Sequence, residues 1–297
     1  MSLSFLKTIA FVVLVTFAQS TSFEAEQREW RDKRDKSLRA ADSWLTVSGL
    51  FWLKEGSNSF GTWNGMNIVL PAGSAPANIG TLELANGVVT LMVTDGVNVR
   101  DWDGNLLRKY EMRFEGDPPG PFSVGSLTLS VIKRGARYGL RVKDKNSKAL
   151  RDFKGLEWFP ARESYRVTAT FIPDPQPKEM MIMNVLGDQL KMKSPGVLSF
   201  TLNGRTNQLR PVVEEGENRL FIIFRDQTAG KTTYGAGRFL YADLPKDGKV
   251  ILDFNHAENP PCAFTAYATC PLTPRANFLP IAIPAGERAF HLNAKKS

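Results

Sequence analysis

The chain has 297 residues, of which 38 are Lys or Arg and 30 are Asp or Glu, so its net charge is +8. Hydrophobic residues make up 42% of the chain, which excludes a disordered tail and predicts a folded protein with a substantial core. The basic residues are dispersed among acids and form no stripe interleaved with aromatic side chains. We therefore expect no nucleic-acid partner.

The first twenty residues have the pattern of a secretory signal peptide. Lys7 supplies a positive charge, residues 9–17 form an apolar run, and small residues precede a cleavage point after Ser20. The apolar run is shorter than the roughly 20 residues that span a bilayer. We predict a signal peptide at residues 1–20, export to the periplasm or the extracellular space, and no membrane span in the mature chain. An uncleaved N-terminal anchor is the alternative.

One helix is predicted, over residues 21–43. Thr21 and Glu24 have the spacing of a capping box. The apolar side chains that fall on one face of this helix are Phe23, Trp30, Leu38 and Ala41. The opposite face is densely charged, so we expect the helix to dock along a narrow stripe on the rest of the protein. A dimerisation or partner-binding helix is the alternative.

From Trp44 onward the pattern predicts strands. Short β-rich runs are separated by Asn-Gly and Asp-Gly pairs, which tolerate the left-handed conformations that hairpin turns need. The clearest hairpin covers residues 82–91, with Asn86 and Gly87 at its tip. The predicted fold class is all-β, with one N-terminal helix followed by two β-sandwich or barrel-like modules.

We place the first module at residues 44–160 and the second at residues 161–292. Pro173, Pro175 and Pro177 alternate near this boundary, and such spacing favours an extended, semi-rigid connection between modules. A loop between two strands of a single domain is the alternative interpretation.

The most unusual residues gather in the segment 232–288, which we name the signature. It contains G-R-F-L ending at Leu240, D-F-N-H-A-E-N-P-P-C ending at Cys262, C-P-L beginning at Cys270, and A-G-E-R ending at Arg288. This set resembles domain of unknown function 1684 (DUF1684), a bacterial and archaeal family. The family pattern has tyrosine where this chain has Glu258.

Two upstream segments are also similar to this family: G-L-F-W-L-K-E-G-S-N-S-F-G from Gly49 and F-K-G-L-E-W-F-P from Phe153. The resemblance therefore extends over nearly the whole mature chain. It implies no activity, because none is attached to the family.

The first module also resembles a forkhead-associated β-sandwich. A glycine-flanked entry at residues 55–61 is followed by M-N-I-V-L-P at 66–71. Forkhead-associated domains bind phosphothreonine with a Ser-Arg-x-His loop, whereas this chain has Ser-Ala-Pro-Ala at 74–77. The resemblance implies a shared topology without phosphopeptide binding.

Cys262 and Cys270 are the only two cysteines. An even pair in an exported protein predicts a disulfide, which would stabilise the fold by about 2.5 kcal/mol. Two structural thiols, or metal ligation together with His256, are the alternatives. His256 and Glu258 just before Cys262 are similar to the zinc deaminase pattern, but the second cysteine lies too far along and prolines break the segment. We predict no metal and no cofactor.

A hydrolase would have to draw on few residues. The chain has two histidines and no G-x-S-x-G elbow, so no catalytic triad is evident. The candidates for general acid and base, beside Arg238, are Asp253, His256, Glu258 and Glu287. This secreted, hydrolase-like enzyme is the alternative hypothesis.

The leading hypothesis is an exported binding or structural module. An arginine and an acid on strand-like segments can form a buried pair, so we expect Arg238 to pair with Asp253. The polar signature residues that would line a ligand site are Tyr234, Arg238, Asp253, Asn255 and Asn259. Such a site would take a small-molecule, carbohydrate or anionic ligand.

Aromatic residues are plentiful, and we expect most to lie in the core. Those that stand out are Phe51, Trp52, Trp63, Trp102, Trp158 and Phe159. Any exposed tryptophan among them would suit a surface on which sugars stack. The oligomeric state is left open by the sequence.

Overall fold

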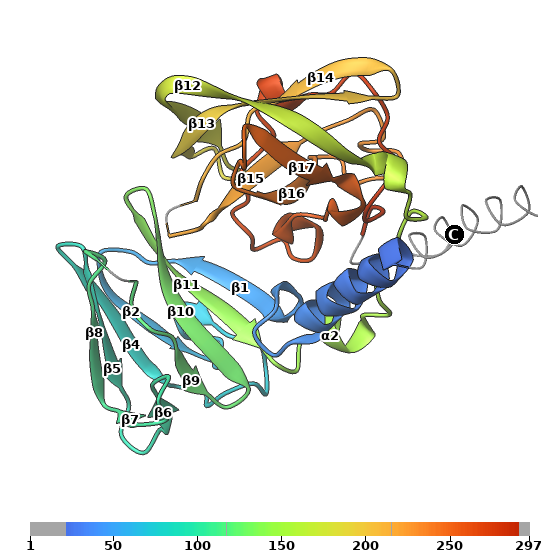
Figure 1. Ribbon diagram of the computed structural model, residues 1–297. Helices are drawn as coiled ribbons and strands as arrows, with labels where there is room; N and C mark the ends of the chain where they lie inside the picture. Colours follow the sequence, from blue (N-terminus) through green and yellow to red (C-terminus); the bar gives the residue numbers. More distant parts are fainter. Residues whose placement is uncertain (1–21, 117, 215, 291–297) are drawn as a thin grey trace, which may run out of the picture. The chain divides into compact units, whose positions relative to one another are not determined.

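The computed structural model describes residues 22–116, 118–214 and 216–290, so the predicted signal peptide and Thr21 lie outside the described residues. The described residues form two compact units (Figure 1). The N-terminal β unit comprises residues 38–154 and 264–269. The C-terminal β unit comprises residues 22–37, 155–263 and 270–290. The predicted all-β class is confirmed, because strands in several sheets dominate both units.

The N-terminal helix covers residues 22–39 and is drawn in blue in Figure 1. It ends earlier than the predicted residue 43, because the backbone N–H of Ser43 turns back to the carbonyl of Ala40 at 3.1 Å. The residues that follow form a short 3-10 helix, Trp44–Thr46. Ala41 consequently lies exposed beyond the helix rather than on its docking face.

The N-terminal β unit is built from two sheets. One has the order β1-β11-β10-β9-β6-β7 and the other has the order β3-β2-β4-β5-β8. The strands are β1 (Val47–Trp52), β2 (Gly56–Gly61), β3 (Ile68–Val69), β4 (Gly80–Ala85), β5 (Val88–Val93), β6 (Val99–Arg100), β7 (Leu106–Leu107), β8 (Lys109–Met112), β9 (Phe122–Val124), β10 (Leu127–Arg134) and β11 (Arg137–Asp144). A single hydrophobic cluster takes residues from both sheets, which makes this unit a β-sandwich.

Side chains that are buried at every second residue explain why these segments form strands. In β10 the side chains of Leu127, Leu129 and Val131 are buried, and the residues between them lie on the other face. The predicted hairpin is confirmed as β4 and β5, with Asn86 and Gly87 at φ 51° and 78°. A one-turn helix, α2 (Lys148–Asp152), follows β11.

The C-terminal β unit has a four-stranded sheet of order β14-β13-β12-β17 and a two-stranded sheet of β15 and β16. Its strands are β12 (Arg166–Met183), β13 (Gln189–Leu202), β14 (Arg205–Leu209), β15 (Arg219–Phe224), β16 (Arg238–Asp243) and β17 (Lys249–Asp253). Short 3-10 helices lie at Glu163–Tyr165, Phe254–His256, Pro261–Ala263 and Arg275–Asn277. One hydrophobic core joins the two sheets to the chain after β17.

The prediction that the alternating prolines form a linker between modules is wrong. Pro173, Pro175 and Pro177 lie inside β12, the long strand that forms a hairpin with β13 (Figure 1). The pairing register shifts between Pro173 and Lys178. A proline has no N–H for a sheet ladder, so the three residues are accommodated in an exposed irregularity of the strand.

Among the described residues, no helix is both long enough and apolar enough to cross a membrane.

Candidate functional site

One face of the N-terminal helix packs on the C-terminal β unit. Phe23 and Gln27 are buried on this face, and Trp30, Arg31 and Arg34 are half-buried on it. These positions follow the spacing of one helical face. Three of the five are polar or charged, so the contact is built largely from hydrogen bonds and ion pairs.

Arg34 lies beside two signature carboxylates. Its Nε donates to Oε1 of Glu287 at 2.8 Å and lies 3.4 Å from Oε2 of Glu258. Its guanidinium also donates to the backbone carbonyl of Asn259. The other oxygen of Glu287 accepts from the backbone N–H and from Nδ2 of Asn259, at 2.7 and 2.8 Å. Glu287 is fully buried, and all of its partners come from the same unit.

Asp253 forms a second group nearer the start of the helix. Its Oδ2 accepts from Nε2 of Gln27 at 3.0 Å and from Nε of Arg166 at 2.7 Å. Its Oδ1 accepts from the backbone N–H and from Nδ2 of Asn255, at 3.0 and 2.7 Å. Arg166 continues to Glu26 on the helix, so two helix residues connect to this carboxylate.

The ring of His256 stacks on an aromatic side chain of the N-terminal helix. Its ring lies 4.3 Å from that of Trp30 with an interplanar angle of 6°. Trp30 in turn meets Trp158 edge-on at 5.4 Å. Nε2 of His256 lies 3.8 Å from Oδ2 of Asp253 and makes no hydrogen bond within the described residues. Burial lowers the pKa of His256 against the opposing effect of Asp253, which favours the neutral imidazole.

We name this arrangement the helix clasp. It comprises Gln27, Trp30 and Arg34 from the helix and Asp253, His256, Glu258, Asn259 and Glu287 from the signature. The sequence predicted the signature members but missed Gln27 and Arg34. Their signal was available, because both interrupt the apolar stripe that runs from Phe23 to Leu38.

The predicted pair of Arg238 and Asp253 does not form. Arg238 is fully buried, and its guanidinium bonds Oδ2 of Asp226 at 3.1 Å and the carbonyls of Ile283 and Ala285. The sheet pairing explains this choice, because Arg238 opposes Phe224 on β15, two residues before Asp226. Asp253 instead ends β17 opposite Arg166 on β12. The sequence around Asp226 carries no signal that would have identified it.

Asn255, another predicted ligand residue, is also fully buried. Its side chain donates to the carbonyl of Arg162 at 2.9 Å and accepts from the backbone N–H of Arg162 at 3.0 Å. It therefore connects the residue before the 3-10 helix Glu163–Tyr165 to the 3-10 helix Phe254–His256.

Tyr234 lies near the two cysteines. Burial raises the pKa of Tyr234, and the neighbouring Cys262 and Cys270 add to that shift. The backbone N–H of Cys262 donates to Sγ of Cys270 at 3.2 Å. The two cysteines are therefore close in space, and both are in the thiol form in the structure. The disulfide stays a prediction.

Glu258 differs from the other acids of the clasp. Burial raises its pKa to about 7, while the Arg34 guanidinium acts to lower it and the Glu287 carboxylate to raise it. Its side chain retains 17% exposure, whereas that of Glu287 has none. Its backbone is fixed by a reciprocal pair of 2.9 Å hydrogen bonds with Phe239 on β16. Burial also raises the pKa of Tyr241, and the Glu258 carboxylate adds to that shift.

The signature lies in a region of the chain that matches a protein family. The family model described as "Protein of unknown function (DUF1684)" matches residues 151–288. The chain belongs to this family. The matched DUF1684 region contains every signature residue of the clasp, whereas the helix that it holds lies upstream of the matched residues.

A solved structure is similar as well. The solution NMR structure of an uncharacterized protein from Haloarcula marismortui is 34% identical to the chain, covering 46% of this chain and 78% of the other, with a TM-score of 0.40. No curated protein matches the chain. The forkhead-associated resemblance of the first module is not confirmed by these comparisons.

In the DUF1684 clasp, hydrogen-bond donors of the protein itself occupy the carboxylates of Asp253 and Glu287. Asp253 and Glu287 in the clasp, and Asp226 outside it, each accept three or more hydrogen bonds from their own unit. Among the described residues, no group of three or more acidic, His or Cys side chains could hold a metal ion. A hollow of about 440 Å³ at the start of the helix, lined in part by Glu26 and Arg166, borders the Asp253 group.

Proposed function

We propose that this protein is an exported binding or structural module in which the DUF1684 signature holds the N-terminal helix. The observation that carries the proposal is the pair of contacts from Gln27 to Asp253 and from Arg34 to Glu287. Two of the four predicted acid–base candidates, Asp253 and Glu287, are thereby used for docking.

The burial of these acids supports docking over catalysis. A general acid or base must reach the atom whose proton it transfers. Glu287 has no exposed surface, and Asp253 is 7% exposed. Removing a partner from such a group leaves a buried charge unpaired, which typically costs 3–5 kcal/mol. Both residues are therefore expected to matter for stability first.

The helix that the clasp holds has a charged outer face. The exposed residues on it include Glu24, Arg28, Asp32 and Lys36. Because the inner face is fixed at several points, the outer charges are held in a defined pattern. A small-molecule, carbohydrate or anionic ligand remains the class of partner that we propose for the protein as a whole.

The clasp can be tested with a pair of neighbouring helix variants. Arg34→Ala removes the cation between Glu258 and Glu287, and we expect it to lower the free energy of unfolding by about 3 kcal/mol. Lys33→Ala is the matched control, because Lys33 contacts only the exposed Glu29 at 2.6 Å among the ion pairs of the described residues. We expect a change within about 0.5 kcal/mol for the control.

Urea unfolding of the purified chain measures both values. Equal, small effects of the two substitutions would contradict a docking role for Arg34 and Glu287.

Export has its own test. The signal-like residues 1–20 predict that the chain, made in a bacterial host, is recovered from the periplasm with Thr21 as its first residue. N-terminal sequencing of the periplasmic fraction checks this. Recovery in the cytosol with residues 1–20 attached would contradict the proposal of export.

Glu258 supports a second candidate function, a hydrolase-like activity. Its pKa of about 7 and its partial exposure are the properties of a general acid or base. The chain would be incubated with chromogenic esters, glycosides and phosphoesters. Hydrolysis that Glu258→Gln abolishes, and that Glu24→Gln leaves intact, would favour this candidate over the binding module.

A further inference from the structure

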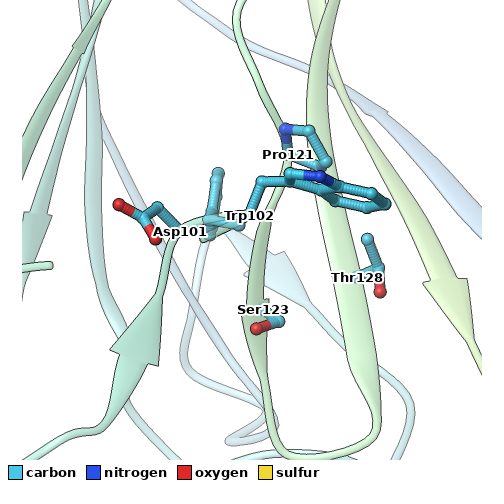
Figure 2. A pocket seen from close by; sticks show the side chains of 6 residues that line it. Asp101, Trp102, Pro121, Ser123 and Thr128 are labelled. Atoms are coloured by element: carbon cyan, nitrogen blue, oxygen red, sulfur yellow. The ribbon is translucent and has the colours of Figure 1, made fainter. Parts of the chain in front are cut away.

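We propose that the N-terminal β unit carries a saccharide-binding site at Trp102. A pocket of about 220 Å³ lies there, lined by Asp101, Trp102, Pro121, Phe122, Ser123 and Thr128. Figure 2 shows the indole of Trp102 reaching across the strands, with Pro121 beside it and Thr128 near the end of the ring system. No residue of the helix clasp lines this pocket, so the proposal is independent of the clasp.

Trp102 is a large aromatic residue left in water. Its exposed fraction is 75%, against 61% for Trp63 in the same unit. Burying apolar surface gains roughly 25 cal/mol per Å², so an indole on the surface offers a ligand considerable free energy. Tryptophan adds little conformational cost, because its side chain has only two rotatable angles.

The turn that carries Trp102 is fixed before any ligand arrives. Oδ1 of Asp101 accepts from the backbone N–H of Asn105 at 2.8 Å, and Oδ2 accepts from Nδ2 of Asn105 at 3.1 Å. These bonds hold the pKa of Asp101 below its usual value. Arg100 donates to the carbonyl of Gly104 at 2.6 Å. A pre-organised turn reduces the entropy that binding would cost.

Two hydroxyl groups lie on the strands beside the indole. Ser123 on β9 and Thr128 on β10 are direct cross-strand partners, and both are half-buried. Neither hydroxyl makes a hydrogen bond to another part of the chain that the structure describes. They are therefore ready to donate to and accept from a ligand in the pocket.

This combination fits one saccharide ring. A pyranose has an apolar C–H face that can stack on an indole and an edge of hydroxyl groups that can bond Ser123 and Thr128. The volume is below the roughly 300 Å³ at which drug-sized ligand pockets begin, so we expect a single ring to be bound. The one charged lining residue is the acidic Asp101, which disfavours phosphate-bearing ligands. A neutral saccharide is therefore favoured over a nucleotide.

The test is titration of the purified chain with neutral hexasaccharides built from glucose, xylose, galactose, mannose and N-acetylglucosamine, followed by calorimetry. We expect at least one to bind, and Trp102→Ala to weaken that binding at least about tenfold. Trp102→Phe should retain part of the affinity, because it keeps an aromatic face. The double substitution of Ser123 and Thr128 by Ala should weaken binding without changing the fold.

Trp63→Ala is the matched control, since it removes another exposed tryptophan from the same unit. It should bind as the unmodified chain does. The proposal is overturned if no hexasaccharide binds, or if Trp102→Ala binds as tightly as the parent. It is also overturned if adenosine monophosphate, rather than a saccharide, is bound through Trp102. Equal melting temperatures of the two tryptophan variants would show that any loss is one of binding rather than of folding.

Discussion

The protonation of Glu258 makes the stability of the clasp depend on pH. Its pKa in the folded chain is about 7, above its ordinary value of 4.5. The folded state therefore holds a proton that the unfolded state has lost between these two values. Stability contributed by the neutral carboxyl is present at low pH and decreases as pH rises from about 4.5 to 7.

Glu258→Gln should remove this dependence. At 1.36 kcal/mol per pKa unit, we expect the variant to be more stable than the parent above pH 7 by up to about 3 kcal/mol, and the difference to vanish near pH 4.5. Urea unfolding of both chains from pH 5 to 8 measures it. His256 and the other groups are common to both chains, so their titration cancels in the difference.

Glu24→Gln, which changes an exposed carboxylate of the helix, should keep the pH profile of the parent. A Glu258→Gln variant whose stability runs parallel to the parent across this pH range would show that Glu258 ionises normally.

Arg238 shows which part of a contact a sequence pattern predicts and which part it does not. Arg238 was correctly expected to be buried with an acid, because a buried guanidinium needs one. Its partner is Asp226 and not Asp253, since the register of β15 and β16 brings Asp226 close. Register depends on contacts along the whole strand pair, which no short motif contains.

At the scale of elements, the A-G-E-R segment depends on close backbone packing. Gly286 has φ 76°, and a Cβ there would overlap the carbonyl oxygen of Ala257 and lie 2.9 Å from that of Phe254. This approach lets the N–H of Glu287 donate to the carbonyl of Ala257 at 2.8 Å. The glycine thus sets the position of the carboxylate that receives Arg34.

Gly286→Ala should therefore destabilise the protein by at least about 3 kcal/mol, because it adds a clash to the strain of a left-handed residue. Gly248→Ala is the matched control, with φ 68° and open space around its Cβ. We expect it to lose only about 1 kcal/mol. Thermal unfolding of the two variants makes the comparison, and equal losses would contradict the close approach.

The loop between Cys262 and Cys270 is a second element whose structure can be tested. Cys262 and Cys270 are close enough for an N–H to sulfur contact of 3.2 Å. We expect the exported chain to show no alkylated thiol in its intact mass unless it is first reduced. Reduction should cost about 2.5 kcal/mol of stability. Two alkylated cysteines without reductant would contradict the disulfide.

For the whole molecule, features that depend on neighbouring residues were predicted better than features that depend on contacts between distant residues. The all-β class and the hairpin at Asn86 and Gly87 followed from turn chemistry and alternation. The proline-rich stretch was misread, because a strand with an exposed irregularity and a linker have the same composition. The clasp itself was half predicted. Its acids lie in a recognisable motif, but Gln27 and Arg34 lie more than two hundred residues away in sequence.

We propose that the signature holds the N-terminal helix. Amide hydrogen exchange of the Arg34→Ala chain, with Lys33→Ala as control, tests it most directly. We predict that the amides of residues 22–39 exchange at least about tenfold faster in Arg34→Ala, while those of β12 and β13 keep their protection. Unchanged exchange in the helix, or equal loss of protection in the helix and in β12 and β13, would contradict the clasp.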